Sequence, residues 1–118
     1  MAGMAKVYKG GLLVAQEVEL ADSFIKRFMG LMFRKSMPQN HGLLLNPCSE
    51  IHTFSMRFPI DAVFLDSKNE ILKIEYAMVP NKIGKSVKNA KCVLELCAHT
   101  AEKYGLRAGD VLDIVKTA

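Results

Sequence analysis

Apolar and polar residues alternate along several short stretches of the chain, which is the period expected of β-strands. The stretch 91–97 is also predicted to be a strand, with Val93, Glu95 and Cys97 on one face and Cys92, Leu94 and Leu96 on the other. Gly10-Gly11 separates two such stretches and can adopt the positive φ angles that a two-residue hairpin turn needs. The pattern therefore predicts strands over residues 7–9, 12–20, 42–45, 50–56, 60–66, 71–77, 91–97 and 111–115.

A different period, close to that of an α-helix, follows the second of these strands. Its apolar members are Phe24, Ile25, Phe28, Met29 and Met32, with Lys26 and Arg27 on the opposite side. We predict a short helix over 23–29 that Asp22 caps and Gly30 ends. A second, single helical turn is expected from Thr100 to Gly105.

The length and composition indicate one globular domain that spans residues 1–118. Half of the 118 residues are hydrophobic and a quarter are charged, which is typical of a folded chain. Seven to eight short strands with two short helices predict a mainly β fold, a compact antiparallel β-sandwich or barrel.

The ends and the charge of the chain bear on its location and partners. The chain has no apolar run of signal-peptide or membrane-spanning length, and its three cysteines are an odd number, so we expect a cytoplasmic protein without a disulfide framework. The net charge is +4, but the loop 81–91 carries lysines without interleaved aromatic residues, which disfavours nucleic-acid binding. No cofactor and no membrane partner are expected, and nothing in the sequence specifies an oligomeric state.

The most distinctive stretch of the sequence is Ile51–Asp66, which contains His52-Thr53-Phe54-Ser55-Met56-Arg57-Phe58-Pro59-Ile60-Asp61. Together with Gly30-Leu31-Met32-Phe33-Arg34, Val93-Leu94-Glu95-Leu96 and Gly109-Asp110, it resembles domain-of-unknown-function family 192, a group of small conserved bacterial and archaeal proteins. The resemblance covers about residues 21–115. The turn here is shorter than the Trp-Met-Lys-Asn-Thr form of many members, which indicates a variant branch. The resemblance implies a β-rich fold and no established activity.

Residues Glu50–Asp66 are expected to form a β-hairpin with Met56 opposite Asp61. His52 is then a polar residue on an otherwise apolar face, either with one backbone partner or in contact with a ligand. Arg57 and Asp61 flank the turn, as a stabilising ion pair or as the charged mouth of a site.

Glu95 lies within an otherwise apolar strand, where an unpaired carboxylate is costly to bury. It therefore needs solvent or a cationic partner, for which Arg34 and Arg57 are the candidates. The leading hypothesis is a binding module for a small polar or anionic molecule, such as a saccharide. Its predicted ligand-binding residues are Arg34, His52, Arg57, Asp61 and Glu95.

Two alternatives rest on other residues. A metal-dependent or cysteine-using enzyme would draw on Cys48, His52, Cys97 and His99, although their spacing is unlike the paired clips of structural zinc sites. On one extended strand Cys48 and His52 would also be about 13 Å apart, too far for a hydrogen bond. A structural or interaction protein would instead use the apolar segments 29–33 and 54–58 as a contact surface.

Overall fold

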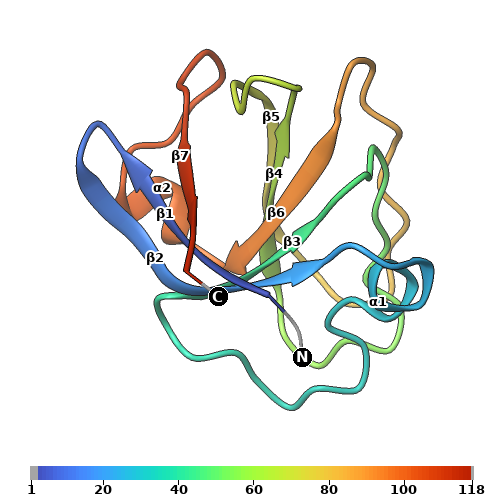
Figure 1. Ribbon diagram of the computed structural model, residues 1–118. Coiled ribbons are helices and arrows are strands. Elements are labelled where there is room, and N and C mark those ends of the chain that lie inside the picture. Colours follow the sequence, from blue (N-terminus) through green and yellow to red (C-terminus); the bar gives the residue numbers. More distant parts are fainter. Residues whose placement is uncertain (1–2, 118) are drawn as a thin grey trace.

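Seven strands form one mixed sheet in the computed structural model, which describes residues 3–117 (Figure 1). The strand order is β5-β4-β6-β3-β2-β1-β7, and all neighbours are antiparallel except β2 and β3, which run parallel. The strands are β1 (Met4–Lys9), β2 (Leu12–Ala21), β3 (His41–Leu45), β4 (Ile60–Leu65), β5 (Ile71–Met78), β6 (Cys92–Cys97) and β7 (Asp113–Lys116). The helices are α1 (Phe24–Met29) and α2 (Thr100–Lys103).

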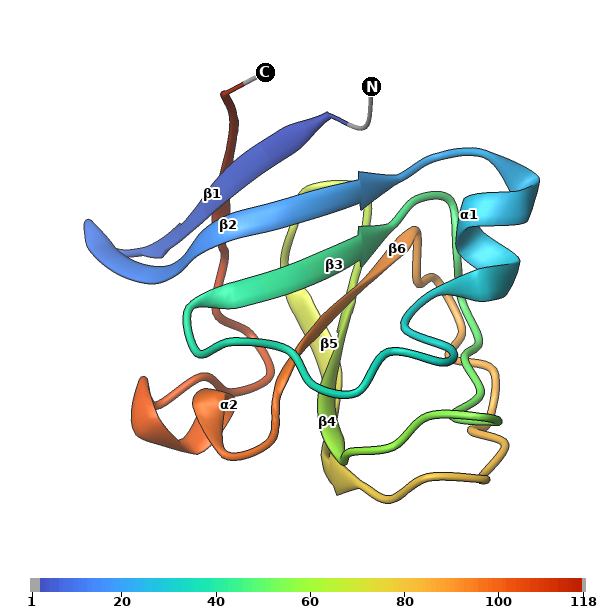
Figure 2. The same cartoon turned by 90° about the horizontal axis from the view of Figure 1, so that it is seen from below.

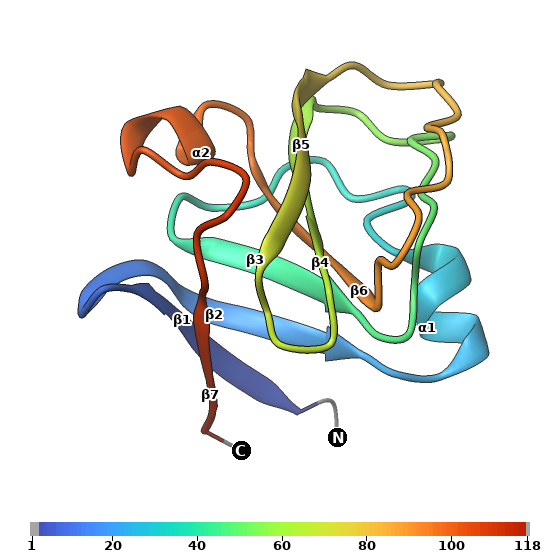
Figure 3. The ribbon, with the colours of Figure 1, turned by 90° about the horizontal axis from the view of Figure 1, so that it is seen from above.

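The expected mainly β fold with two short helices is confirmed, but two finer expectations need correction. The sheet is not purely antiparallel, because β2 and β3 are parallel neighbours. It curls without closing into a barrel (Figures 2 and 3), and a sandwich of two sheets is not confirmed. Backbone hydrogen bonds between residues 69–71 and 109–112, with a single bridge between Glu70 and Val111, tie the curled sheet together.

The first hairpin is confirmed. Gly10 and Gly11 have φ angles of 54° and 82°, a combination that residues with a Cβ rarely adopt. This turn joins β1 to β2. Strand β1 also pairs with β7, so it lies between β2 and β7.

Helix α1 begins one residue later than expected and packs little of its surface. Ser23, not Asp22, is its N-cap, because the Ser23 hydroxyl accepts the Lys26 N–H at 3.2 Å. Gly30 ends the helix with a φ of 48°, as expected. No residue of α1 is buried, and Phe24 is 76% exposed, so the apolar side of the helix is open. None of the helices in residues 3–117 is long and apolar enough to cross a membrane.

Strands β4 and β6 run through the middle of the protein and are buried along their whole length. Their register pairs Ala62 with Glu95 and Asp61 with Leu96, so Glu95 and Asp61 point to opposite faces of the sheet. Each face has its own core. One core contains Val63, Leu65, Leu94 and Leu96, and the other contains Leu31, Ile51, Ala62, Phe64 and Val93. Each such buried Leu, Ile or Phe stabilises the fold by about 2 kcal/mol.

The expected strand 50–56 and its hairpin with 60–66 do not form. Residues 50–56 are irregular, with one isolated bridge from His52 to Ile83, and β4 pairs with β5 and β6 instead. The register that placed Met56 opposite Asp61 is therefore wrong. Ser55 has a φ of 59°, in the left-handed region, which interrupts any extended run.

Thr53 fixes this irregular segment from inside the protein. It is fully buried, and its hydroxyl donates to the Val79 carbonyl at 2.7 Å and accepts the Lys82 N–H at 2.9 Å. Segment 48–53 consequently lies along segment 82–91, held by backbone bonds such as Gly84 N–H to the Ile51 carbonyl. These loops gather with α1 at one end of the sheet, whereas α2 lies at the other (Figures 1 and 3).

Candidate functional site

Glu95 lies at the floor of a cavity of about 260 Å³ beneath α1. It projects from β6 between Ala62 of β4 and Leu43 of β3, and only 2% of its surface is exposed. Gly30, which ends α1, is close to the Glu95 carboxyl: a Cβ built at Gly30 would be 3.8 Å from Glu95 Oε1. We call this cavity the α1 cleft.

The Oε1 atom of Glu95 is fully buried and has no hydrogen-bond partner among residues 3–117. Burial raises the pKa of Glu95 from 4.5 to about 8, because water no longer solvates the charged form. The Arg34 cation opposes this shift. Glu95 is therefore mainly a neutral carboxylic acid at pH 7.

The walls of the α1 cleft are mostly apolar. They come from α1, from the segment that follows it, from the end of β3 and from the irregular segment 48–56. The apolar lining residues are Phe24, Phe28, Met29, Leu31, Met32, Leu45, Ile51 and Met56. Around the mouth, Phe24, Phe28 and Phe54 are 76%, 59% and 42% exposed. The site therefore offers an apolar enclosure with a single buried acid at its base.

His52 lines the same cleft. Its Nδ1 atom accepts the N–H of Phe54 at 3.2 Å, so in the neutral ring the proton lies on Nε2. The ring also packs between two aromatic side chains, with centroid distances of 5.3 Å to Phe54 and 6.0 Å to Phe28. His52 is thus an oriented hydrogen-bond donor, and the tautomer leaves no free lone pair on Nε2 for a metal ion.

Cys48 is the third polar group of the cleft. Its thiol donates to the Glu50 carbonyl at 3.0 Å. Burial raises the pKa of Cys48 above its ordinary value of 9.0, and the charge of Glu95 adds to this effect. The thiolate that a nucleophilic cysteine needs is therefore disfavoured at neutral pH.

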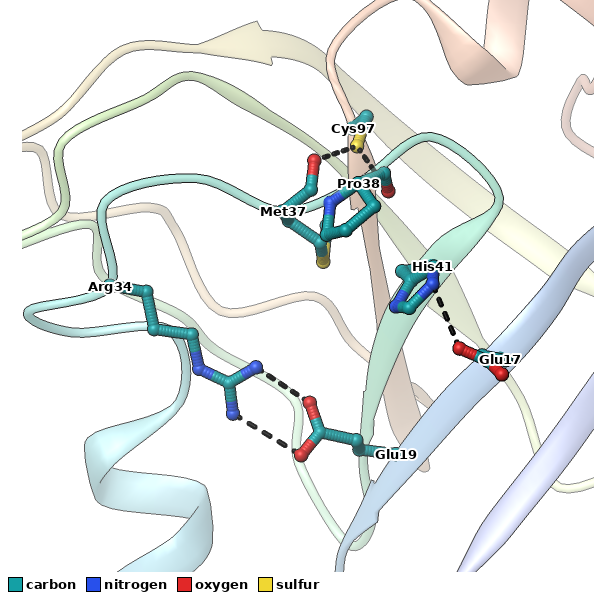
Figure 4. A network of polar contacts seen from close by, with 7 residues as sticks. All are labelled: Glu17, Glu19, Arg34, Met37, Pro38, His41 and Cys97. Atoms are coloured by element: carbon teal, nitrogen blue, oxygen red, sulfur yellow. Dashed lines mark hydrogen bonds and ion pairs between the residues drawn. The ribbon is translucent and has the colours of Figure 1, made fainter.

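Arg34 does not pair with Glu95. Its guanidinium makes a forked contact with Glu19, with distances of 2.6 Å and 3.4 Å, and both side chains are more than a third exposed (Figure 4). This pair lines a second, smaller hollow of about 210 Å³ with Gly30 and Leu43. Arg34 thus acts on Glu95 only through its charge, from beside the cleft.

Asp61 and Arg57 do not join Glu95 and His52 in the cleft. The fully buried carboxylate of Asp61 accepts the N–H of Ala77 at 2.8 Å and the N–H of Ala101 at 2.9 Å. It therefore fixes the end of β5 and the start of α2. Arg57 is exposed. Of the five predicted ligand-binding residues, the structure brings only His52 and Glu95 into one cavity.

The four residues of the metal alternative do not converge either. Cys97 donates its thiol to the carbonyls of Met37 and Pro38 at 3.1 Å and 3.3 Å (Figure 4), and His99 is an exposed residue before α2. Across residues 3–117, no group of three or more His, Cys, Asp or Glu side chains is placed to hold a metal ion.

Arg27 and three methionines of the cleft were not predicted as members of a ligand site. Arg27 lines it from α1 while donating to the Asp22 carbonyl at 3.0 Å, and Met29, Met32 and Met56 supply thioether walls. The high methionine content, seven residues, was the available signal, because methionine is common on adaptable binding surfaces.

Comparison with known proteins places the chain among uncharacterised families. Residues 5–114 match the family DUF192, described as "Uncharacterized ACR". A UPF0127 protein of Pyrococcus furiosus is 33% identical over 102 residues, which cover 82% of this chain and 85% of that protein. A UPF0127 protein of Thermococcus sibiricus is 32% identical, with 81% of this chain and 64% of that protein covered.

Two solved structures share the fold. A chain from Sinorhizobium meliloti, described provisionally as a transcription regulator, has a TM-score of 0.83 and 27% identity, and the match covers 97% of this chain and 94% of that one. A protein of unknown function from Novosphingobium aromaticivorans also has a TM-score of 0.83, with 20% identity and coverage of 95% and 84%.

Proposed function

The chain belongs to the DUF192 family, and we propose that it is a binding module for a small molecule with an apolar body and one polar end. The ligand would occupy the α1 cleft. The observation that carries this proposal is the Oε1 atom of Glu95, which is buried in the lining of the cleft and has no hydrogen-bond partner within residues 3–117.

An unpartnered polar group in an apolar environment costs about 1–3 kcal/mol or more. Natural sequences retain such a cost mainly where function needs it. A ligand that hydrogen bonds to Glu95 would recover this free energy, and its apolar body would gain contacts with walls such as Phe28 and Met56. The cleft volume is close to the small end of the range for small-molecule sites.

The same walls argue for a compact amphipathic molecule over a saccharide. A sugar carries a hydroxyl on nearly every carbon and needs a matching set of polar partners. The cleft offers few polar groups, which are Arg27, Cys48, Glu50, His52 and Glu95, against eight apolar side chains. The enzyme alternative receives less support, because the Cys48 thiol is held in its neutral form.

Methyl-labelled methionine makes the test direct. Met29, Met32 and Met56 line the cleft, whereas Met37 and Met78 lie outside it and report on the fold. Compact amphipathic compounds are added one at a time, and the methyl resonances are followed by NMR. We expect some compounds to shift the three cleft methyls alone.

Two variants give the matched comparison. Glu95→Leu should weaken binding at least about tenfold, because it removes the polar partner, while the exposed Glu102→Gln on α2 should leave binding unchanged. The proposal is refuted if no compound shifts the cleft methyls, or if Glu95→Leu binds as well as the native protein.

A contact surface for another macromolecule is the second candidate. It is favoured by the exposed aromatic side chains Phe24 and Phe28, which line the cleft, by Phe54, which stacks on His52, and by Phe33, which is also exposed. Light scattering of the native protein and of Phe24→Ser tests it for self-association. A strictly monomeric native protein would count against this candidate.

A further inference from the structure

We propose that the polar end of the ligand is a carboxylate, and that Glu95 binds it as a protonated acid that donates a hydrogen bond. This inference rests on the proposed function and specifies the charge of the ligand. It is argued from the hydrogen-bond donors that line the cleft.

The polar groups around Glu95 are predominantly donors. His52 has its Nδ1 lone pair occupied by the Phe54 N–H, so Nε2 offers a proton. Arg27 uses one guanidinium nitrogen on the Asp22 carbonyl, and the rest of its fork remains for an acceptor. His52 and Arg27 thus favour an acceptor, and the most compact group that accepts several hydrogen bonds and balances a guanidinium is a carboxylate.

Glu95 itself completes this set. Glu95 lies between Leu43 and Ala62 of the neighbouring strands, Gly30 is next to its Oε1 atom, and no residue within 3–117 forms a hydrogen bond with that atom. An apolar enclosure of this kind keeps a carboxylic acid neutral at pH 7, and such an acid can donate to an oxyanion. The protonated form is also the only one that does not repel a bound carboxylate.

A ligand with an ammonium group fits less well. It would require Glu95 to ionise inside the cleft, and it would lie in the same cavity as the Arg27 cation. Glu50 is the remaining acidic residue of the lining and is exposed at the rim.

Binding should therefore depend on the protonation of Glu95. The titratable and charged groups that surround it are Arg27, Arg34, Cys48, Glu50 and His52. The arginines keep their charge across the useful pH range, and the raised pKa of Cys48 keeps that thiol mainly neutral up to about pH 9. With the pKa of Glu95 at about 8, the protonated fraction falls about tenfold between about pH 7 and about pH 9.

The test uses the native protein with benzoate as the carboxylate probe and benzylamine as a cation of matched shape. Dissociation constants come from the methyl shifts of Met29, Met32 and Met56, and Met37 and Met78 show that the protein is folded at each pH. We expect benzoate to bind about tenfold more weakly at about pH 9 than at about pH 7. Benzylamine should not bind.

Glu95→Gln is the matched variant, because its amide still donates a hydrogen bond and cannot lose a proton in this range. Its benzoate affinity should change less than about twofold between the two pH values. All groups other than Glu95 are the same in both proteins, so the difference between their pH profiles isolates Glu95.

Each other outcome counts against the inference in a distinct way. If benzylamine binds more tightly as the pH rises, the polar end of the ligand is a cation and not a carboxylate, and the proposed function still holds. If benzoate binding has the same pH profile in the native protein and in Glu95→Gln, the Glu95 proton does not contribute to binding. If neither probe shifts the cleft methyls of a folded protein, the proposed function fails and this inference fails with it.

Discussion

The buried acid of β6 makes the stability of the protein depend on pH in a direction opposite to that of most surface carboxylates. The pKa of Glu95 is about 8 in the folded protein and 4.5 in the unfolded chain. Between these values the folded state holds one proton more than the unfolded state. The free energy of unfolding therefore falls as the pH rises, is highest below about pH 4.5 and reaches its lower plateau above about pH 8.

The size of this effect follows from the shift. Each pKa unit corresponds to about 1.4 kcal/mol, so the full difference of three and a half units is about 5 kcal/mol. Between about pH 5 and about pH 7.5, where both states are easy to handle, the expected loss is about 3 kcal/mol. This is a large fraction of the 5–15 kcal/mol that is typical of a small domain.

Glu95→Gln removes this dependence, because the amide is uncharged throughout. Urea unfolding of the native protein and of the variant is measured at a series of pH values, and the free energies are subtracted at each pH. All other titrating groups cancel in the difference. The variant should gain about 3 kcal/mol relative to the native protein between about pH 5 and about pH 7.5.

A second variant guards against a general effect of charge removal. Glu102→Gln removes an exposed carboxylate from α2 and should give a nearly constant difference over the same range. The reasoning is refuted if the difference for Glu95→Gln is also constant, because Glu95 would then titrate as it does in water.

Three further predictions concern groups outside this titration. Asp61→Asn should lower the free energy of unfolding by about 2 kcal/mol, because each of the two buried Asp61 oxygens accepts one backbone N–H and the amide can keep only one of these bonds. Asp66→Asn should cost clearly less in the same urea assay, because a single Asp66 oxygen at an exposed turn accepts both backbone N–H groups and the amide oxygen can replace it. Thr53→Val should cost about 1–3 kcal/mol and speed hydrogen exchange at the Lys82 amide, and unchanged exchange there would contradict the proposed anchor. The Cys48 thiol should react slowly with iodoacetamide at about pH 7 and faster as the pH approaches 9, as followed by mass spectrometry, and rapid reaction at neutral pH would restore the case for a nucleophilic cysteine.

Strand β6 is a part of the fold that could be predicted from the sequence. The faces of β6 and the place of Glu95 among apolar neighbours follow directly from the two-residue period of a strand. Gly30 as a helix end and Gly10-Gly11 as a turn were also predictable, because their positive φ angles exclude most other residues.

Segment 50–56 shows why the rest was not predictable. Its alternation of apolar and polar residues resembles that of a strand, but Thr53 is buried through hydrogen bonds to residues 79 and 82, which are distant in sequence. Local pattern carries no information about such partners. The same holds for Arg34, whose contact with Glu19 depends on the path of the chain after α1.

The α1 cleft was predicted only in part for a related reason. Glu95 and His52 were identified because each is polar in an apolar context. The helical pattern places Arg27 on the side opposite the apolar residues, and the convergence of α1 with segment 48–56 arises only in the folded protein. Asp61 carried the same polar-among-apolar signal as Glu95 but serves the backbone on the other face of the sheet.

The parallel pairing of β2 and β3 has a topological consequence. Two antiparallel neighbours can be joined by a two-residue turn. Between parallel neighbours, the chain must first return to the end of the sheet at which the first strand began. Residues 22–40 make this return, and α1 forms within it (Figure 2). One wall of the hollow above Glu95, made by α1 and the residues that follow it, therefore belongs to a segment that the direction of β3 requires.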